Sequence, residues 1–333
     1  MFDGVYSWID GCVGWLDDLL DRAKTRSFHE APTAALLLAP PFAILLVFGI
    51  FPLFFAMYLS LFGGKYGMGP FIGMANYVEA LHSRDFWNSL LITLYYAVGT
   101  IPVTMAISFL IAYGLFHIMR GRGVLRTFYF LPYVTSAVAA AMIWRTILNP
   151  QFGVANGVFE WLGLTPQAWL LEPRSVLHLL TGGWVGTSVG PSLALCCVIA
   201  FDIWHASGFM IVVFLAGLST IPRELEEAAR IDGAGTWQVM QRVVIPLLSP
   251  TIFFLAIVSG IKSFQAFNSF YALTGNGRGP VDTTQNMTVY IYSSFYESQR
   301  WGYGAAVAAL LCVAIVGLTL VQWRYVGRKV HYE

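Results

Sequence analysis

Six long runs of apolar residues dominate this chain and constrain its fold more than any other feature. They cover approximately residues 34–61, 90–118, 125–148, 193–218, 251–273 and 305–323. About 20 apolar residues suffice for a helix to cross a bilayer, and lipid leaves few alternatives to a helix because backbone polar groups need internal partners. The sequence therefore predicts an all-α, polytopic membrane protein with about six transmembrane helices. The start of the fourth span stays open, since residues 176–180 are also apolar.

The composition excludes several other classes of protein. Only 11% of the residues are charged, whereas a soluble domain carries roughly 25%. A formal net charge of +1 argues against a nucleic-acid partner. The cysteines show no metal-ligand spacing with histidine and are interpreted as small apolar packing residues; they are Cys12, Cys196, Cys197 and Cys312.

The first 32 residues form a segment apart from the spans. An apolar stripe with spacings of three and four predicts an amphipathic helix on the membrane surface or against a neighbouring helix; its members are Trp8, Cys12, Trp15, Leu16 and Leu19. A poorly ordered tail is the alternative. Acidic residues interrupt the stretch and no basic start precedes an apolar run, so a cleavable signal is not expected. The expected division is residues 1–32 as this segment and 33–333 as the transmembrane domain.

Basic residues in the loops predict the orientation of the spans, because cytoplasmic loops are enriched in lysine and arginine. One side carries twelve of them: Arg22, Lys24, Arg26, Arg120, Arg122, Arg126, Arg223, Arg230, Arg242, Arg324, Arg328 and Lys329. The other side carries five: Lys65, Arg84, Arg174, Arg278 and Arg300. Both termini are therefore expected in the cytoplasm.

The loop between the fourth and fifth runs, residues 222–247, has an unusual design. Pro222 is expected to end the fourth span, and a short helix over 224–230 has acidic residues in its first turn, which favours the helix dipole. Gly233 and a second glycine two residues later permit a sharp turn, after which residues 237–244 can resume as a helix. Pro246 is then expected to break the chain before the fifth span. Such a helix–glycine–helix unit suits docking to another protein, although composition alone also fits an ordinary loop.

The residues of this loop resemble a known motif. Glu227-Ala228-Ala229, then Gly233, then Val243-Val244-Ile245-Pro246 follow the spacing of the "EAA" motif of permease subunits in binding-protein-dependent ABC importers. The flanking residues and the sequence 321–330 are similar to the carbohydrate branch, including maltose and glycerol-3-phosphate permeases. We call residues 221–246 the EAA segment. Residues 1–30 and 177–192 depart from the family pattern, the latter as a glycine-rich insertion.

The resemblance implies a type I ABC importer permease fold and a division of labour. This chain would pair with a second homologous permease, two ATP-binding subunits and an extracytoplasmic solute-binding protein in a bacterial or archaeal cytoplasmic membrane. The EAA segment would couple the ATPase to alternating access through Glu226, Glu227, Ala228, Ala229, Asp232, Gly233 and Pro246. The chain has no phosphate-binding Gly-x-x-x-x-Gly-Lys run, so ATP and magnesium are expected on the partner and no cofactor on this chain. The resemblance implies a transport subunit rather than an enzyme.

Among the charged residues in the apolar runs, Lys262 is expected to have the highest free-energy cost of insertion into the membrane. Counting 1.5 Å per residue places it about 20 Å deep, where a lysine costs roughly 2.5–3.5 kcal/mol. The same count places Asp202 near the outer interface and about 10 Å too far out to pair with it. Asp202 and His205 are interpreted either as hydrated interfacial groups or as cavity residues.

A continuous helix over 251–273 would give Lys262 a polar face beside an aromatic one, by the periodicity of about 100° per residue. The tentative substrate pathway comprises Ser259, Lys262, Ser263, Gln265, Phe267, Asn268 and Tyr271, and Ser269 shares the polar face. Hydroxyl edges and C–H faces of sugars suit this pairing, while packing between helices is the other interpretation. The predicted function is import of a sugar, oligosaccharide, polyol or sugar-phosphate-like solute. A secondary transporter of a small polar solute is the alternative.

Overall fold

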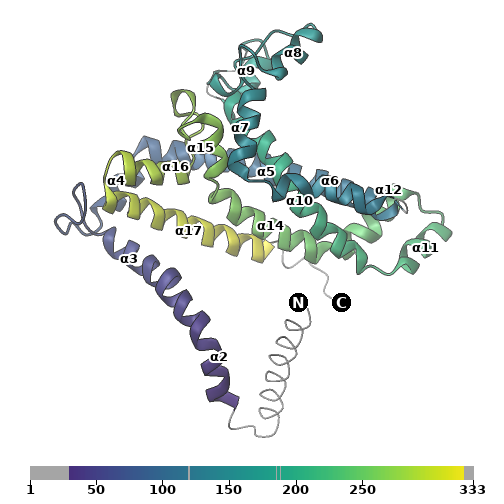
Figure 1. Ribbon diagram of the computed structural model, residues 1–333, viewed down its shortest axis with the longest axis horizontal. Coiled ribbons are helices and arrows are strands. Elements are labelled where there is room, and N and C mark those ends of the chain that lie inside the picture. The colour runs from purple at the N-terminus through teal and green to yellow at the C-terminus, as the bar shows by residue number, and fades with distance from the viewer. Residues whose placement is uncertain (1–29, 119–120, 185, 188, 326–333) are drawn as a thin grey trace, which may run out of the picture. The chain divides into compact units, whose positions relative to one another are not determined.

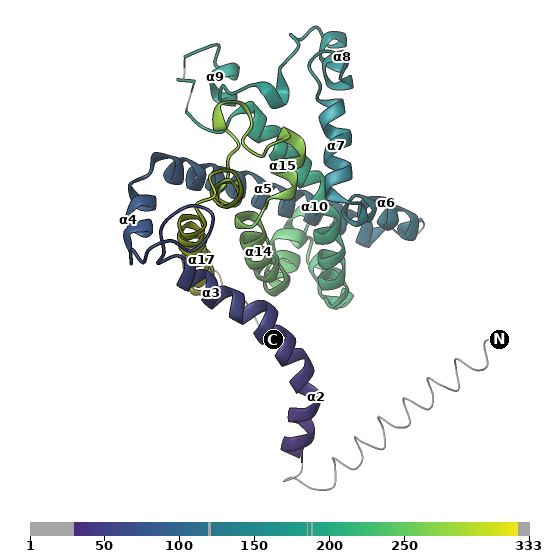
Figure 2. The same ribbon diagram turned by 60° about the vertical axis from the view of Figure 1, so that its left-hand side comes forward.

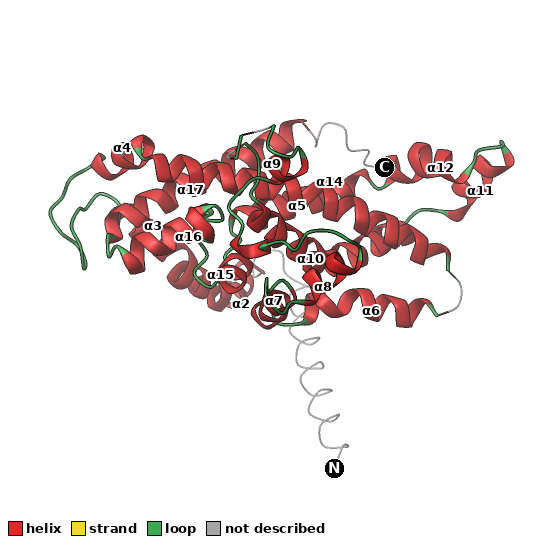
Figure 3. Ribbon diagram, turned by 90° about the horizontal axis from the view of Figure 1, so that it is seen from above, coloured by secondary structure: helices red, strands yellow, loops and turns green. Residues whose placement is uncertain are grey.

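The computed structural model describes residues 30–118, 121–184, 186–187 and 189–325. These residues form helices and loops with no strand among them (Figure 3). Within them, four helices are long and apolar enough to cross a membrane, and two bent helix pairs raise the number to six. The all-α, polytopic prediction is confirmed, while residues 1–29 of the predicted N-terminal segment 1–32, including its apolar stripe from Trp8 to Leu19, lie outside the described part of the chain.

The chain divides into two compact units, Met1–Tyr58 and Leu59–Glu333. The described part of the first consists of α2 (Glu30–Leu45), the π-helical turn η1 (Leu46–Ile50) and α3 (Phe51–Leu59), which extends one residue into the second unit. Together they supply an apolar span over Ala34–Leu59. The wide turn lies directly before Pro52, where the N–H of Phe51 donates to the carbonyl of Leu46. A wide turn suits this place because proline lacks an N–H and clashes with the carbonyl four residues earlier.

The second unit contains the remaining helices. Its first half comprises α4 (Ala75–His82), α5 (Arg84–His117), α6 (Arg122–Val134), α7 (Ala137–Ile147), α8 (Val154–Trp161), η2 (Trp169–Leu171) and α9 (Val176–Leu180). Its second half comprises α10 (Leu193–Ser219), α11 (Arg223–Ile231), α12 (Thr236–Val239), η3 (Met240–Val244), α13 (Ile245–Leu247), α14 (Ser249–Phe264), α15 (Asn268–Thr274), η4 (Pro280–Asp282), α16 (Met287–Tyr292), η5 (Ser293–Glu297) and α17 (Trp301–Tyr325). Residues 176–180 form a separate short helix, so the fourth span begins at Leu193.

Helices α5 and α10 pack along each other through the middle of this unit, with α6 and α14 beside them (Figure 1). Helices α11 and α12 lie at one end of the unit and α4 at the opposite end (Figure 1). Two glycines of α10 permit the close packing. A Cβ at Gly208 would lie 2.6 Å from the Tyr129 carbonyl oxygen of α6, and one at Gly217 would lie 2.6 Å from Thr251 Oγ1 of α14.

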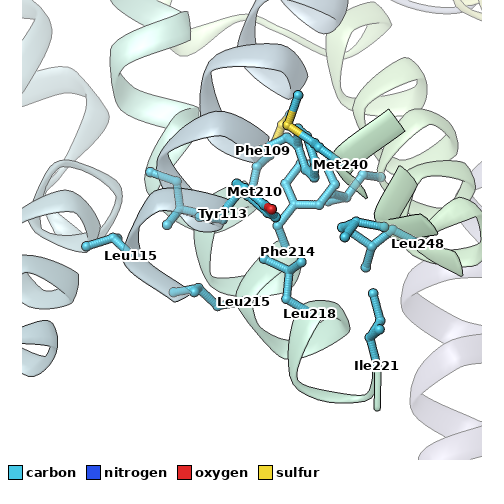
Figure 4. Close-up of a cluster of buried hydrophobic side chains, with 14 of the residues drawn as sticks. Phe109, Tyr113, Leu115, Met210, Phe214, Leu215, Leu218, Ile221, Met240 and Leu248 are labelled. Carbon is cyan, nitrogen blue, oxygen red and sulfur yellow. The ribbon is translucent and has the colours of Figure 1, made fainter. Parts of the chain in front are cut away.

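A buried apolar cluster fixes the EAA segment to the bundle (Figure 4). Phe109 of α5 meets Phe214 of α10 edge to face, with ring centroids 5.7 Å apart. Val239 and Met240 from the EAA segment and Leu248 join the same cluster. The base of the EAA segment therefore packs into the core formed by α5 and α10, whereas its tip is exposed. Figure 2 shows the second unit from another side, with α10 between α5 and α6.

Two predicted spans are not single straight helices. The third is bent by 92° between Gly123–Val134 and Ala137–Ile147. In the fifth, α14 ends at Phe264 and α15 begins only at Asn268, so the continuous helix predicted over 251–273 is wrong. The carbonyl of Ala266 accepts hydrogen bonds from Asn286 Nδ2 and Thr288 Oγ1. These side chains from α16 and its N-cap replace the helical N–H partner and stabilise the break.

The helix break predicted at Pro246 lies two residues later, at Leu248. The helical path continues through α13 to Leu247, and the bend of 69° comes immediately afterwards, before α14. The wide turn η3 precedes this proline, with the N–H of Ile245 donating to the carbonyl of Met240. As at Pro52, the extra residue in the turn accommodates the proline without ending the helix.

Candidate functional site

The tip of the EAA segment turns at Gly233, as predicted. Gly233 adopts φ = +84°, a conformation in which other L-residues are strained. Its N–H donates to the carbonyl of Arg230 at 3.0 Å, and the N–H of Ala234 donates to that of Ala229 at 2.9 Å. This pair of bonds is the Schellman pattern, which satisfies the last carbonyls of α11. The turn is thus built from contacts within a few residues.

A buried carboxylate connects this tip to the end of α5. Only 8% of Glu226 is exposed, and its Oε2 lies 3.1 Å from His117 Nε2 and 3.8 Å from Arg230 Nη2. The other ring nitrogen of His117 lies 2.9 Å from the carbonyl oxygen of Tyr113, one turn back in α5. Glu226 therefore fixes α11 against the bundle, and it does not lie on the open surface of the segment.

Other parts of the EAA segment are exposed and partly apolar. Ile231 and Trp237 are 85% and 61% exposed, and Leu225 is 43% exposed. Among the predicted coupling residues, Glu227, Ala228, Asp232 and Gly233 are exposed, whereas Ala229 and Pro246 are half-buried. Large exposed apolar side chains with small and acidic neighbours form a surface suited to a protein partner.

The second unit also contains a cavity of about 260 Å³ between α5, α6, α10 and α14. Ser259, Lys262 and Ser263 of the predicted pathway line it. Tyr96 and Thr100 of α5, Tyr133 of α6, and Asp202, His205 and Phe209 of α10 line its other walls. Four helices remote in sequence thus surround one space whose mostly apolar and aromatic walls carry several polar side chains.

Lys262 meets aromatic faces in this cavity. Its Nζ lies 4.8 Å from the ring centroid of Phe209 and 5.8 Å from that of Tyr133. Within the described part of the chain, no carboxylate forms an ion pair with Lys262. The rings supply the electrostatic attraction of a cation–π contact and leave the donors of the ammonium open to the cavity.

Asp202 lies on the wall of the same cavity as Lys262. The hydroxyl of Tyr96 donates to its Oδ2 at 2.8 Å. Among the described residues no ion pair joins Asp202 to Lys262, and the difference in depth of about 10 Å stays a prediction.

The remaining predicted pathway residues do not line this cavity. Gln265, Phe267, Asn268 and Tyr271 follow the end of α14, so they do not continue its polar face. Ser269 is buried and interacts with Asp202. Sequence reasoning missed Tyr96, Thr100 and Tyr133; only their weak polar character within apolar runs could have indicated them.

A cavity with a lysine and other polar side chains on its walls, among helices long enough to span a membrane, fits the membrane subunit of a solute transporter. The chain belongs to the family of binding-protein-dependent transport system inner membrane components, whose model matches residues 35–330. It is a multi-pass permease component of an ABC importer, a transport subunit whose ATPase is a separate subunit. Family membership rules out the secondary-transporter alternative.

Curated relatives align over most of the chain. The trehalose/maltose transport system permease protein MalF of Thermococcus litoralis is 29% identical over 303 residues, covering 90% of this chain and 95% of that protein. The sn-glycerol-3-phosphate transport system permease protein UgpA of Agrobacterium fabrum is 31% identical over 300 residues, covering 89% and 95%. A permease chain in the crystal structure of a bacterial alginate ABC transporter, complexed with an alginate pentasaccharide-bound periplasmic protein, has the same fold. Its TM-score is 0.73 at 22% identity, covering 87% of this chain and 92% of that one.

Proposed function

We propose that this permease imports a carbohydrate, polyol or sugar-phosphate-like solute through the cavity around Lys262. The observation that carries the proposal is the wall chemistry: the Lys262 ammonium lies over the rings of Phe209 and Tyr133, and Tyr96, Ser259 and Ser263 line the same cavity. Hydroxyl-rich solutes offer oxygens to the lysine and C–H faces to the rings. The named solutes of the two curated relatives, trehalose or maltose and glycerol 3-phosphate, belong to this chemistry.

In this proposal the solute moves by alternating access in a complex of several subunits. A second homologous permease completes the pathway, a solute-binding protein delivers the solute outside, and two ATP-binding subunits carry ATP and magnesium in the cytoplasm. The exposed face of the EAA segment, with Glu227, Ala228, Asp232 and Gly233, docks on one ATPase subunit. Pro246 and Ala229 support that face from the half-buried side.

The orientation forms part of the same proposal, with the EAA segment and both termini in the cytoplasm. Two of the basic residues expected outside, Arg278 and Arg300, line one pocket with Glu79 of α4. Helix α4 lies at the end of the unit opposite to α11 and α12 (Figure 1). The group of basic residues expected in the cytoplasm has twelve members and the group expected outside has five, as the positive-inside rule requires for this orientation.

Lys262→Met tests the cavity. The substitution keeps the length of the side chain and removes its charge, so packing against Phe209 is retained. In proteoliposomes containing the complete transporter, we expect uptake of maltose, trehalose or glycerol 3-phosphate, whichever the wild type carries, to fall at least about tenfold, the equivalent of ~1.4 kcal/mol. Basal ATPase activity and subunit assembly should persist.

Lys65→Met is the matched control, because Lys65 is exposed in the loop before α4. Unchanged uptake in Lys262→Met would exclude the cavity from the pathway. Failure of the complex to assemble would show that Lys262 is a packing residue.

A further inference from the structure

The glycine-rich stretch that departs from the family pattern belongs to a loop whose two ends are bonded to each other. The N–H of Val176 donates to the carbonyl of Pro191 at 3.1 Å, and the N–H of Leu193 donates to the carbonyl of Arg174 at 3.0 Å. These bonds join the segment before α9 to the start of α10. We call residues 174–184, 186–187 and 189–193 the α9 loop; it has a fixed base and is not a simple tether.

The α9 loop and the start of α5 line a pocket of about 450 Å³. Helix α5 contributes Arg84, Asp85 and Asn88 to its walls, and all three side chains are exposed. Asp282 of η4 also lines the pocket and is paired with Arg278 at 3.3 Å. Among the residues that the structure describes, neither Arg84 nor Asp85 forms an ion pair. The pocket thus offers an unpaired cation and an unpaired carboxylate to an incoming group.

This pocket lies at the end of α5 that is remote from the EAA segment. Arg84 is the first residue of α5, and His117, its last residue, contacts Glu226. At 1.5 Å per residue the two ends of this helix are about 50 Å apart. The charged residues of the pocket precede the apolar run that starts at residue 90, and the α9 loop ends where α10 begins, at Leu193. The charged wall therefore lies outside the apolar spans, on the outer side in the proposed orientation.

Large apolar side chains around the pocket are exposed. Leu180 and Trp184 of the α9 loop are 78% and 94% exposed, and Val281, which lines the pocket from η4, is 84% exposed. A solute held in the pocket would leave Leu180 and Trp184 uncovered, whereas the surface of a protein can cover them. Tryptophan and arginine are also the residue types that contribute most to protein–protein interfaces. The region therefore suits a protein partner better than a small solute.

We propose that the α9 loop, together with Arg84 and Val281, is a docking site for the solute-binding protein of this transporter. The partner presents an apolar patch to Leu180 and Trp184, and side chains of opposite charge to Arg84 and Asp85. A stretch outside the family pattern suits this role, because specificity for one partner requires contacts that related permeases lack. The inference rests on the proposed function, since the outer side follows from the proposed orientation, and deepens it by locating the contact with one partner.

Fluorescence anisotropy tests the site, with the labelled solute-binding protein of this system as the probe and the complete transporter in lipid nanodiscs. We expect the Kd to rise about tenfold in Trp184→Ala and severalfold in Leu180→Ala, because each substitution removes apolar area from the contact. Arg84→Gln should raise the Kd severalfold at low salt and less at high salt, since salt screens an exposed ion pair.

Trp161→Ala is the matched control, because Trp161 of α8 is an exposed tryptophan outside the α9 loop. Its Kd and the basal ATPase activity of every variant should equal those of the wild type. Since Leu180 and Trp184 are largely exposed, their alanine variants should fold and assemble. An equal rise in Kd in Trp161→Ala would contradict a specific role of the α9 loop.

Uptake in proteoliposomes separates this inference from the proposed function. With saturating binding protein, uptake by Trp184→Ala should return to the wild-type rate, because only docking is weakened. Carbohydrate uptake by the wild type, with an unchanged Kd in Trp184→Ala and Leu180→Ala, would overturn the docking site and leave the proposed function intact. Weakened docking in these variants, with wild-type uptake of a solute of another class, would overturn the proposed function alone.

Two further outcomes would assign the region to something other than the binding protein. A higher KM for the solute in Arg84→Gln, with an unchanged Kd for the binding protein, would make the pocket a solute site. Loss of Trp184→Ala from the membrane fraction would make the α9 loop a membrane anchor. Either result would overturn the docking site.

Discussion

The EAA segment and the central cavity differ in how their residues come together. In the EAA segment, the turn at Gly233 is closed by bonds between residues five or fewer positions apart. In the cavity, Lys262 of α14 meets Tyr133 of α6 and Phe209 of α10, while Tyr96 of α5 binds Asp202. A local motif can form from the sequence of one loop, whereas the cavity exists only when four helices have packed.

Both regions are nevertheless anchored to the same helix. Tyr96 near the middle of α5 bonds to the cavity wall, and His117 at its end contacts Glu226 of the EAA segment. At 1.5 Å per residue these two anchors are roughly 30 Å apart along one uninterrupted helix. We therefore predict that a substitution in the EAA segment changes ATPase stimulation without changing solute binding in the cavity. Helix α5 contributes contacts to both regions.

Among substitutions that affect only one of the two regions, the largest effect is expected at Glu226, on ATPase stimulation. Glu226→Ala removes the buried acceptor of His117, a contact worth about 1–2 kcal/mol when discounted for the exposure of the histidine. Detachment of α11 from α5 should lower ATPase stimulation by the solute-loaded binding protein more than about tenfold. Steady-state ATPase measurements on the reconstituted transporter would show this.

Glu224→Ala is the control for that effect, since Glu224 is exposed on the same helix. Solute binding in the cavity should be unchanged in both variants. A loss of binding in Glu226→Ala would mean that the two regions are not independent.

A severalfold effect is expected at Gly233. Valine there adopts φ = +84° only at a cost of about 1–2 kcal/mol. A Cβ at this position has no neighbour within 4 Å, so the effect would be conformational and not steric. Uptake by Gly233→Val should fall severalfold while the protein still inserts into the membrane. Gly235→Ala should transport normally, because Gly235 has φ = −71°; equal losses in both variants would contradict the role of the turn.

The smallest effect is expected on protein stability, at the ion pair between Glu79 and Arg300, which lies outside both regions. The hydrogen-bonded guanidinium of Arg300 lowers the pKa of Glu79, and both side chains are substantially exposed. A carboxyl whose pKa is lower in the folded state stabilises the protein above its unfolded pKa, and this contribution is lost as the pH falls through the folded pKa. Screening limits it to about 0.5 kcal/mol.

When the pH is lowered from about 6 to about 3, the Tm of the wild-type complex should therefore fall by ~1–2 °C more than the Tm of the Glu79→Gln complex. ATPase stimulation and solute binding should not differ between the two proteins. A change in either would show that the outer ion pair is coupled to one of the compared regions.

The sequence predicted the features that depend on local composition or on a short motif. Apolar runs long enough for a bilayer identified the spans because lipid permits few other folds, and the glycine at 233 identified the turn because few residues adopt positive φ. The break after Phe264 escaped sequence reasoning, since its cause is a pair of hydrogen bonds from Asn286 and Thr288, about 20 residues away. Because of this break, the prediction that Gln265 and Tyr271 lie on the same helix as Lys262 is also wrong.

The sequence alone thus determined that this protein is a bundle of membrane helices with a structured loop between the fourth and fifth spans. Hydrophobicity and backbone conformation act on residues close in the chain, so both can be recognised without a structure. Only the tertiary structure decided what lies beside Lys262 and Glu226. The partners of a buried charge come from other helices, and the bends at residues 135–136 and Leu248 set which helices those are.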